Sequence, residues 1–254
     1  MCLILLAWQS HPDYPLVVAA NRDEFYSRRA ASADFLPDHP HVLAGRDLEA
    51  GGTWLGITRQ GRFAALTNFR DPASHKPAAP SRGNLVADFL KGDAGIDAYL
   101  DRLDPAAYNG FNLLLGNVAN NGRLVAFSNV SGVRHELTPG IYGLSNALLD
   151  TPWPKVGAGK RALQQAIAAL PDESALFQLL ADQAVHPDDA LPATGVSPEW
   201  ERLLSAAFVR SPDYGTRCST LIKLGADGTG IFDEQTWLPD AKAGERRRFR
   251  FKLR

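Results

Sequence analysis

Cysteine and net charge are both scarce in this sequence. Its 254 residues contain two cysteines, Cys2 and Cys218, which are too few for a disulfide framework. Neither belongs to a CxxC motif or a Cys/His cluster that would predict structural zinc. Lys and Arg number 27 against 28 Asp and Glu, so the net charge of −1 gives no overall attraction to nucleic acid or an anionic membrane. We therefore expect no metal site and no nucleic-acid partner.

Long apolar runs are also missing. No stretch approaches the ~20 consecutive apolar residues of a membrane-spanning helix, so no integral membrane segment is expected. The apolar start, Met1–Trp8, is too short for a signal peptide and has no basic leader, which makes the cytoplasm the expected location. Because the chain has no low-complexity linker and no internal repeat, we expect one domain spanning residues 1–254.

Turn residues divide much of the chain into pairs of short apolar segments. Asn-Gly, Asp-Gly and similar pairs between two such segments predict β-hairpins. The expected strand pairs are 2–8 with 16–20, 54–58 with 62–67, 111–118 with 124–128 around Asn120-Asn121-Gly122, and 217–224 with 230–233. A further strand is expected near the end of the chain, where Phe249, Phe251 and Leu253 alternate with basic residues.

Helical periodicity lies between these hairpins. Apolar residues three and four apart predict helices over 96–103, 163–170 and 176–180, and Ser197-Pro198-Glu199 is typical of a helix start. Several strands, notably 2–8 and 111–118, are apolar throughout, so both of their faces need cover. Two mostly antiparallel sheets packed face to face, with helices outside each, meet this need. We therefore predict an α+β fold, a four-layer αββα sandwich.

Cys2 is the first candidate for chemistry. Removal of Met1 would make it the terminal residue, with an α-amino group whose pKa is about 7.7–8.0. Such an amine can accept the thiol proton, so that one residue supplies both nucleophile and base. The alternative is that Cys2 is a small buried residue at the start of a strand, because free cysteine is commonly part of the core.

The segment Asn21-Arg22-Asp23-Glu24 follows the second apolar segment directly. If that strand continued, Arg22 and Glu24 would share one face and Asp23 would lie on the other. A guanidinium beside the Cys2 sulfur would lower the thiol pKa, and a carboxylate could hold the α-ammonium group. The alternative is a solvated turn whose Arg–Asp pair contributes little free energy.

Three further polar residues stand next to apolar segments. Asn68 and Asn146 each follow one, and their side-chain amides could donate to a developing oxyanion, although asparagine also ends ordinary strands. Arg217 is either a second cation of the site or a surface residue. Its neighbour Cys218 is expected to be part of a strand core.

Several segments, taken in order, resemble one family. They are Cys2, residues 21–28, Gly51-Gly52-Thr53-Trp54-Leu55-Gly56, residues 108–112, residues 142–149 with Thr151-Pro152-Trp153, and residues 214–217. Together the sequence resembles the transport and Golgi organisation protein 2 family, whose domain is named NRDE after residues 21–24. The resemblance implies a fold similar to N-terminal-nucleophile hydrolases, in the branch that contains penicillin V acylase and bile salt hydrolase.

Members of that branch cleave amide bonds with a terminal cysteine, assisted by an Arg–Asp pair, strand-end asparagines and a late arginine. By motif, Cys2, Arg22 and Asn146 match these positions well, and Asn68 and Arg217 match loosely. In the acylases the Asp follows the Arg by three residues, whereas here Asp23 is adjacent and Glu24 follows, so either acid could hold the amine. The residues expected to contact substrate are Asn21, Glu24, Trp54 and Tyr142.

The resemblance leaves two functions open. One is acyl hydrolysis through Cys2, acting on an amide or a thioester that includes acyl-coenzyme A, with no cofactor. The other is a non-catalytic carrier, because the family's attributed roles are haem trafficking and the handling of lipids or acyl-coenzyme A. The expected partner is therefore a small hydrophobic or acylated ligand, with haem as the ligand of the carrier alternative.

Overall fold

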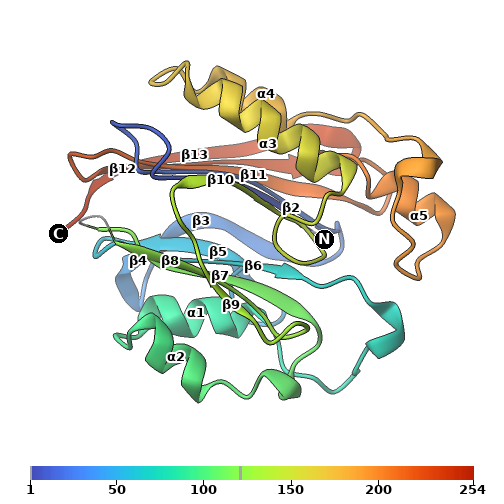
Figure 1. The fold of residues 1–254 in the computed structure, drawn as a ribbon, viewed down its shortest axis with the longest axis horizontal. Coiled ribbons are helices and arrows are strands. Elements are labelled where there is room, and N and C mark those ends of the chain that lie inside the picture. Colours follow the sequence, from blue (N-terminus) through green and yellow to red (C-terminus); the bar gives the residue numbers. More distant parts are fainter. Residues whose placement is uncertain (1, 120–121) are drawn as a thin grey trace.

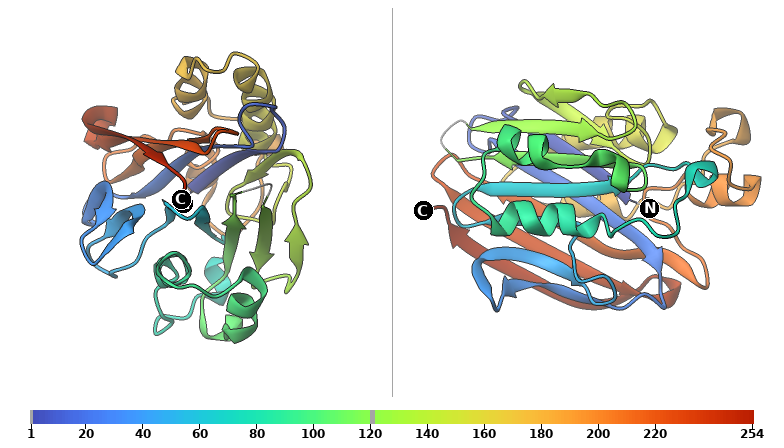
Figure 2. Two further views of the ribbon diagram at one scale, coloured as in Figure 1. Left: turned by 90° about the vertical axis from the view of Figure 1, so that its left-hand side faces the viewer. Right: turned by 90° about the horizontal axis from the view of Figure 1, so that it is seen from below.

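A computed structural model describes residues 2–119 and 122–254, and Figure 1 shows two antiparallel sheets stacked face to face. Helices cover the outer face of each sheet, and the end-on view of Figure 2 places α3 and α4 on one outside and α1 and α2 on the other. The predicted four-layer αββα sandwich is therefore confirmed.

The first sheet carries the start of the chain on the strand next to one of its edges. Its strands, in spatial order, are β10 (Gly140–Leu144), β1 (Cys2–Trp8), β2 (Leu16–Phe25), β11 (Tyr214–Leu224), β12 (Thr229–Leu238) and β13 (Lys242–Lys252). Strand β2 runs through the 21–24 tetrad instead of ending before it, because β1 and β11 pair with it on both sides.

The second sheet is formed mainly by consecutive hairpins. Its strands, in order, are β3 (Ala30–Leu36), β4 (His39–Asp47), β5 (Leu55–Thr58), β6 (Arg62–Asn68), β7 (Phe111–Asn117), β8 (Arg123–Ser128) and β9 (Arg134–Glu136). The predicted pair β7–β8 is confirmed, while Asn120 and Asn121 of its expected turn lie outside the described residues. The sequence patterns did not predict β3 and β4.

The helices are α1 (Gly83–Lys91), α2 (Ile96–Arg102), α3 (Pro154–Ile167), α4 (Ser174–Leu180) and α5 (Pro198–Leu203). Short 3-10 turns lie at Pro72–Ser74, Pro105–Ala107, Asp188–Ala190 and Pro239–Ala241. Helix α1 was not predicted, because Pro80 and Gly83 interrupt the pattern at its start. Within the described ranges, no helix is long and apolar enough to cross a membrane.

Strand β1 is apolar on both faces because each face has its own core. Ile4, Leu6 and Trp8 pack between the two sheets, whereas Leu3 and Leu5 pack beneath α3 and α4. Full burial of such side chains contributes about 1.5–3 kcal/mol each. Since side chains alternate along a strand, Cys2 shares the face of Ile4 and points between the sheets.

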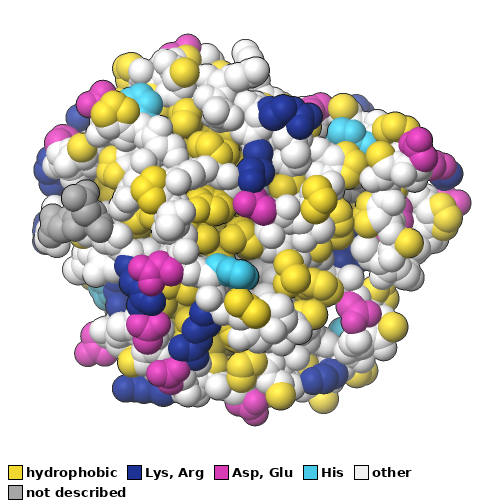
Figure 3. Space-filling view, viewed as in Figure 1, with side chains coloured by type: hydrophobic (Ala, Val, Ile, Leu, Met, Phe, Trp, Pro, Cys, Tyr) yellow, Lys and Arg dark blue, Asp and Glu magenta, His cyan; other side chains and the backbone are white. Residues whose placement is uncertain are grey.

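Charged side chains of both signs are interspersed over the face shown in Figure 3. This agrees with the near-zero net charge of the sequence. The chemistry of the molecule therefore depends on local groups of charges rather than on an overall field.

Candidate active site

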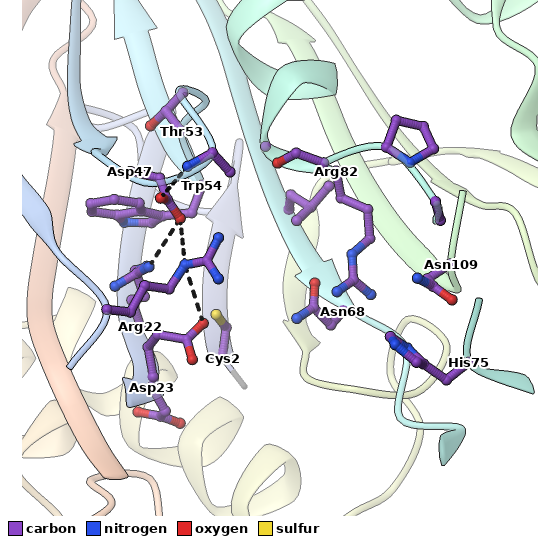
Figure 4. Close-up of a pocket in the computed structure, with 18 of the residues that line it drawn as sticks. Cys2, Arg22, Asp23, Asp47, Thr53, Trp54, Asn68, His75, Arg82 and Asn109 are labelled. Carbon is purple, nitrogen blue, oxygen red and sulfur yellow. Dashed lines mark hydrogen bonds and ion pairs between the residues drawn. The ribbon is translucent and has the colours of Figure 1, made fainter. Parts of the chain in front are cut away.

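A pocket of about 300 Å³ lies at one end of the space between the sheets, where β1 begins. Its polar lining comprises Cys2, Arg22, Asp23, Glu24, Arg28, Asp47, Thr53, Asn68, His75, Lys76, Ser81, Arg82 and Asn109, together with Trp54. Figure 4 shows Cys2, Arg22, Asp47 and Trp54 on one side and Asn68, His75 and Arg82 on the other. The pocket therefore joins residues from both sheets and from the segment between β6 and α1.

The thiol of Cys2 is half-buried at the edge of this pocket. Burial raises the pKa of the Cys2 thiol; the charge of Asp23 acts in the same direction, and the charge of Arg22 opposes it. The expected effect of Arg22 on the thiol pKa is therefore present, but desolvation is larger, so the net shift of the pKa is upward. At neutral pH the thiol is protonated and needs a base to become a nucleophile.

Arg22 is the neighbour of Cys2 on the paired strand, and its backbone also pairs with Cys218. The guanidinium stacks on the Trp54 ring at 4.4 Å and lies 3.7 Å from Asp47 Oδ2. Its Nη1 is buried and has no hydrogen-bond partner in the described part of the chain. The Arg22 guanidinium thus keeps one donor that the described chain does not use.

Asp23 and Glu24 lie on opposite faces of β2, as the alternation predicted. Glu24 Oε1 accepts from the Phe25 amide at 2.9 Å, and Oε2 lies 4.0 Å from Arg28. Asp23 is completely buried, points away from the pocket in Figure 4, and accepts a hydrogen bond from the Thr216 hydroxyl at 2.7 Å. Burial raises the pKa of Asp23, and the charge of Lys155 opposes the rise.

The loop after β10 holds the backbone of Cys2. The Cys2 nitrogen lies 3.4 Å from Asn146 Oδ1, and the Ser145 hydroxyl donates to the Cys2 carbonyl at 3.0 Å. Asn146 is itself fully buried, and its Nδ2 donates to the Asn68 carbonyl at 2.8 Å. Asn146 therefore contacts the nitrogen of Cys2 rather than standing free in the pocket, whereas the Asn68 side chain faces the pocket in Figure 4.

Besides Asn146, three expected site residues lie outside the lining of the Cys2 pocket. Arg217 Nη1 donates to the carbonyls of Phe25 and Arg28 at 2.7 and 2.8 Å and so fixes the end of β2. Asn21 Nδ2 donates to the backbone carbonyls of Leu180 and Ala207, both at 2.8 Å. The Tyr142 hydroxyl donates to the Thr138 carbonyl at 2.8 Å. Their polar contacts are structural, and none of the three lines the 300 Å³ pocket.

Lys155 is the main buried residue that the sequence reasoning missed. It lies at the start of α3, is 3% exposed, and its Nζ has no hydrogen-bond partner among the residues described. Burial lowers the pKa of Lys155 to about 8, although the charge of Asp23 opposes this. Helical periodicity could have indicated its burial, because Lys155 precedes the buried Leu163 and Ala166 by two and three helical turns and so shares their face of α3.

A second, more apolar pocket of about 540 Å³ adjoins the first and shares Glu24, Asn68, His75 and Arg82 with it. Its ring surface is formed by Phe25, Phe69, Trp200 and Tyr214. Tyr214 makes edge contacts with Phe25 and Trp200, with ring centroids 5.0 and 5.2 Å apart. An apolar ligand group can pack there while a polar group reaches Cys2. No group of three or more metal-ligating side chains occurs among residues 2–119 and 122–254.

Solved structures share this fold at low sequence identity. A Caenorhabditis elegans orthologue of N-acylethanolamine-hydrolyzing acid amidase superposes with a TM-score of 0.51 and 11% identity, covering 87% of this chain and 92% of that one. A C2A mutant of conjugated bile acid hydrolase from Clostridium perfringens superposes with a TM-score of 0.50 and 11% identity, covering 98% and 92%. These similarities establish the N-terminal-nucleophile hydrolase fold.

Sequence comparison gives the family. The chain is 42% identical over 260 residues to the Bos taurus Transport and Golgi organization protein 2 homolog, covering 94% of each protein. It is 38% identical over 276 residues to the Homo sapiens homolog, covering 100% of this chain and 99% of that protein. The family model described as Transport and Golgi organisation 2 matches residues 1–239. This chain therefore belongs to the transport and Golgi organisation 2 family.

Proposed function

We propose that this protein hydrolyses an acyl amide or thioester, with Cys2 as the nucleophile after removal of Met1. The proposal is carried by one observation: Cys2 opens onto a pocket beside Arg22, while its backbone nitrogen lies 3.4 Å from Asn146 Oδ1. A free α-amine at that nitrogen would sit next to its own thiol and in contact with a fixed acceptor. The acylase-like fold supports the same reaction class by analogy.

The reaction begins with transfer of the thiol proton to the α-amine, since burial raises the pKa of the Cys2 thiol. The sulfur bonds to the carbonyl carbon, and the leaving amine or thiol departs with the proton held by the α-ammonium. Water then attacks the acyl-enzyme and gives one proton to the amine. The carbon–sulfur bond breaks, the sulfur regains that proton, and the carboxylic acid leaves.

Two donors are available for the oxyanion that forms at the carbonyl oxygen. They are the buried Nη1 of Arg22 and the side-chain amide of Asn68, which faces the pocket. Removal of one donor of this kind typically lowers kcat by about 10²–10³-fold. The adjoining pocket with Phe25, Trp200 and Tyr214 in its wall would hold the apolar part of the acyl group.

The test is a comparison of two cysteine variants. The intact mass first establishes whether Met1 is removed, and mass spectrometry then follows acylation by N-acyl amino acids, other acyl amides and acyl-coenzyme A. We expect an adduct on Cys2 and turnover that Cys2→Ala abolishes. Cys218→Ala is the matched control, because Cys218 flanks Arg22 on the opposite strand, and it should retain both.

Turnover that survives in Cys2→Ala, or a protein that keeps Met1, would refute this mechanism. Titration with haem examines the carrier alternative on the same samples. A saturable Soret shift without any acyl adduct would favour that alternative over hydrolysis.

A further inference from the structure

The two walls of the Cys2 pocket differ in charge balance. On the β2–β4 side, Asp47 Oδ2 lies 2.7 Å from Nε of Arg28 and 3.7 Å from Nη2 of Arg22. Burial favours the neutral acid, but hydrogen bonds from the Ala50 amide and from Arg28 hold the pKa of Asp47 below its usual value. Glu24 adds a second carboxylate 4.0 Å from Arg28. Arginines and carboxylates on this wall therefore neutralise one another.

The facing wall is cationic and has no such balance. Arg82 Nη1 donates to the Gly110 carbonyl at 3.0 Å, and Lys76 Nζ donates to the Ala106 carbonyl at 2.7 Å. Neither forms an ion pair with a carboxylate of the described chain. Figure 4 shows Arg82 and His75 projecting into the pocket from the side opposite Cys2.

Arg82 is the less solvated of these two cations. Burial lowers the pKa of Arg82, yet a guanidinium stays charged at physiological pH. Arg82 is partly desolvated, faces the pocket, and has a backbone carbonyl as its only described hydrogen-bond partner. An anion that enters the pocket would compensate best for the water that this cation has lost. The planar fork of donors of Arg82 matches a carboxylate bidentately.

We infer that Arg82, with Lys76 and His75, selects substrates whose leaving group carries a carboxylate. This inference rests on the proposed function of Cys2. The apolar pocket beside Tyr214 takes the acyl group, so the charged pocket remains for the leaving group. At about 300 Å³ it is at the lower limit of ligand pockets, roughly 300–1,000 Å³, which suits a compact head such as an amino acid.

The test uses substrates that differ in one charge. N-Decanoylglycine is compared with its methyl ester and with N-decanoylethanolamine, for wild type, Arg82→Gln and the remote control Arg134→Gln, an exposed arginine on β9. Wild type should prefer the carboxylate in kcat/KM. Arg82→Gln should lose about 10- to 100-fold on N-decanoylglycine and change less than about twofold on the neutral substrates. Arg134→Gln should match wild type.

Other outcomes separate this inference from the proposed function. Cys2-dependent turnover without a charge preference, or with a preference that Arg82→Gln leaves intact, overturns the inference and leaves the hydrolase standing. A second comparison uses decanoyl-coenzyme A and the neutral decanoyl N-acetylcysteamine thioester. If wild type prefers decanoyl-coenzyme A and Arg82→Gln loses that preference, the anion that Arg82 binds is a phosphate, and the carboxylate assignment is overturned. If no substrate turns over, calorimetry of N-decanoylglycine with Cys2→Ala decides. Arg82-dependent binding then supports recognition of the carboxylate by Arg82 although the proposed hydrolysis has failed, and absence of binding overturns the inference.

Discussion

Lys155 provides a quantitative prediction, because its ammonium is buried without a hydrogen-bond partner in the described chain. We expect Lys155→Met to stabilise the protein at pH 7. Methionine fills a similar volume and carries no charge, so the variant removes the desolvated cation while keeping the packing beneath α3. Asp23 loses an attractive charge in the variant, and that loss is already included in the pKa of Lys155.

The magnitude follows from that pKa. Burial lowers the pKa of Lys155 from 10.5 to about 8. At about 1.4 kcal/mol per pH unit, this difference corresponds to about 3 kcal/mol of free energy of unfolding. Below pH 8 Lys155 is protonated in both the folded and the unfolded state, so the folded state bears the full free-energy cost of the buried charge. Between pH 8 and 10.5 the folded state releases the proton while the unfolded state keeps it, so wild-type stability from this group rises with pH.

Urea unfolding at pH 7 and pH 10 measures both consequences. Lys155→Met should exceed wild type by about 2–3 kcal/mol at pH 7 and by under about 1 kcal/mol at pH 10. Lys155→Arg is the matched control, because its charge is retained throughout this range and it should be less stable than Lys155→Met at both pH values. Equal stability of wild type and Lys155→Met at pH 7, or a pH-independent difference, would refute the reasoning. A lysine kept at such a cost beside the proposed site is itself typical of functional residues.

Two further predictions concern residues in and beside the Cys2 pocket. Gly52→Ala should lower the free energy of unfolding by about 1–3 kcal/mol, because a Cβ there would lie 2.3 Å from the Gly83 carbonyl carbon. In the control Gly95→Ala the added Cβ meets nothing within 4 Å. Chemical denaturation measures both variants, and equal free energies of unfolding would contradict the close packing at Gly52. Arg22→Gln should raise the thiol pKa of Cys2, because the positive charge lowers it; the pH midpoint of iodoacetamide alkylation should move upward, and an unchanged midpoint would show that Arg22 does not act on the thiol.

Local patterns predicted the layers and part of the site. Strands that are apolar on both faces indicated cover on both sides, and β1 has a separate core on each face. The alternation of Arg22, Asp23 and Glu24 followed once β2 continued through them. Helix α1 was not predicted because turn residues interrupt its pattern. Strands β3 and β4 were not predicted because polar residues break the apolar alternation of both strands.

Sequence patterns alone were sufficient for the sandwich, because the need to cover both faces of an apolar strand depends only on neighbouring residues. Long-range packing decided the chemistry around Cys2. Asn146 reaches the Cys2 nitrogen across 144 positions, Arg82 faces Cys2 from a loop of the other sheet, and burial outweighs the lowering effect of Arg22 on the thiol pKa. Desolvation and charge pairing depend on which surfaces exclude water together, and only the assembled layers determine that.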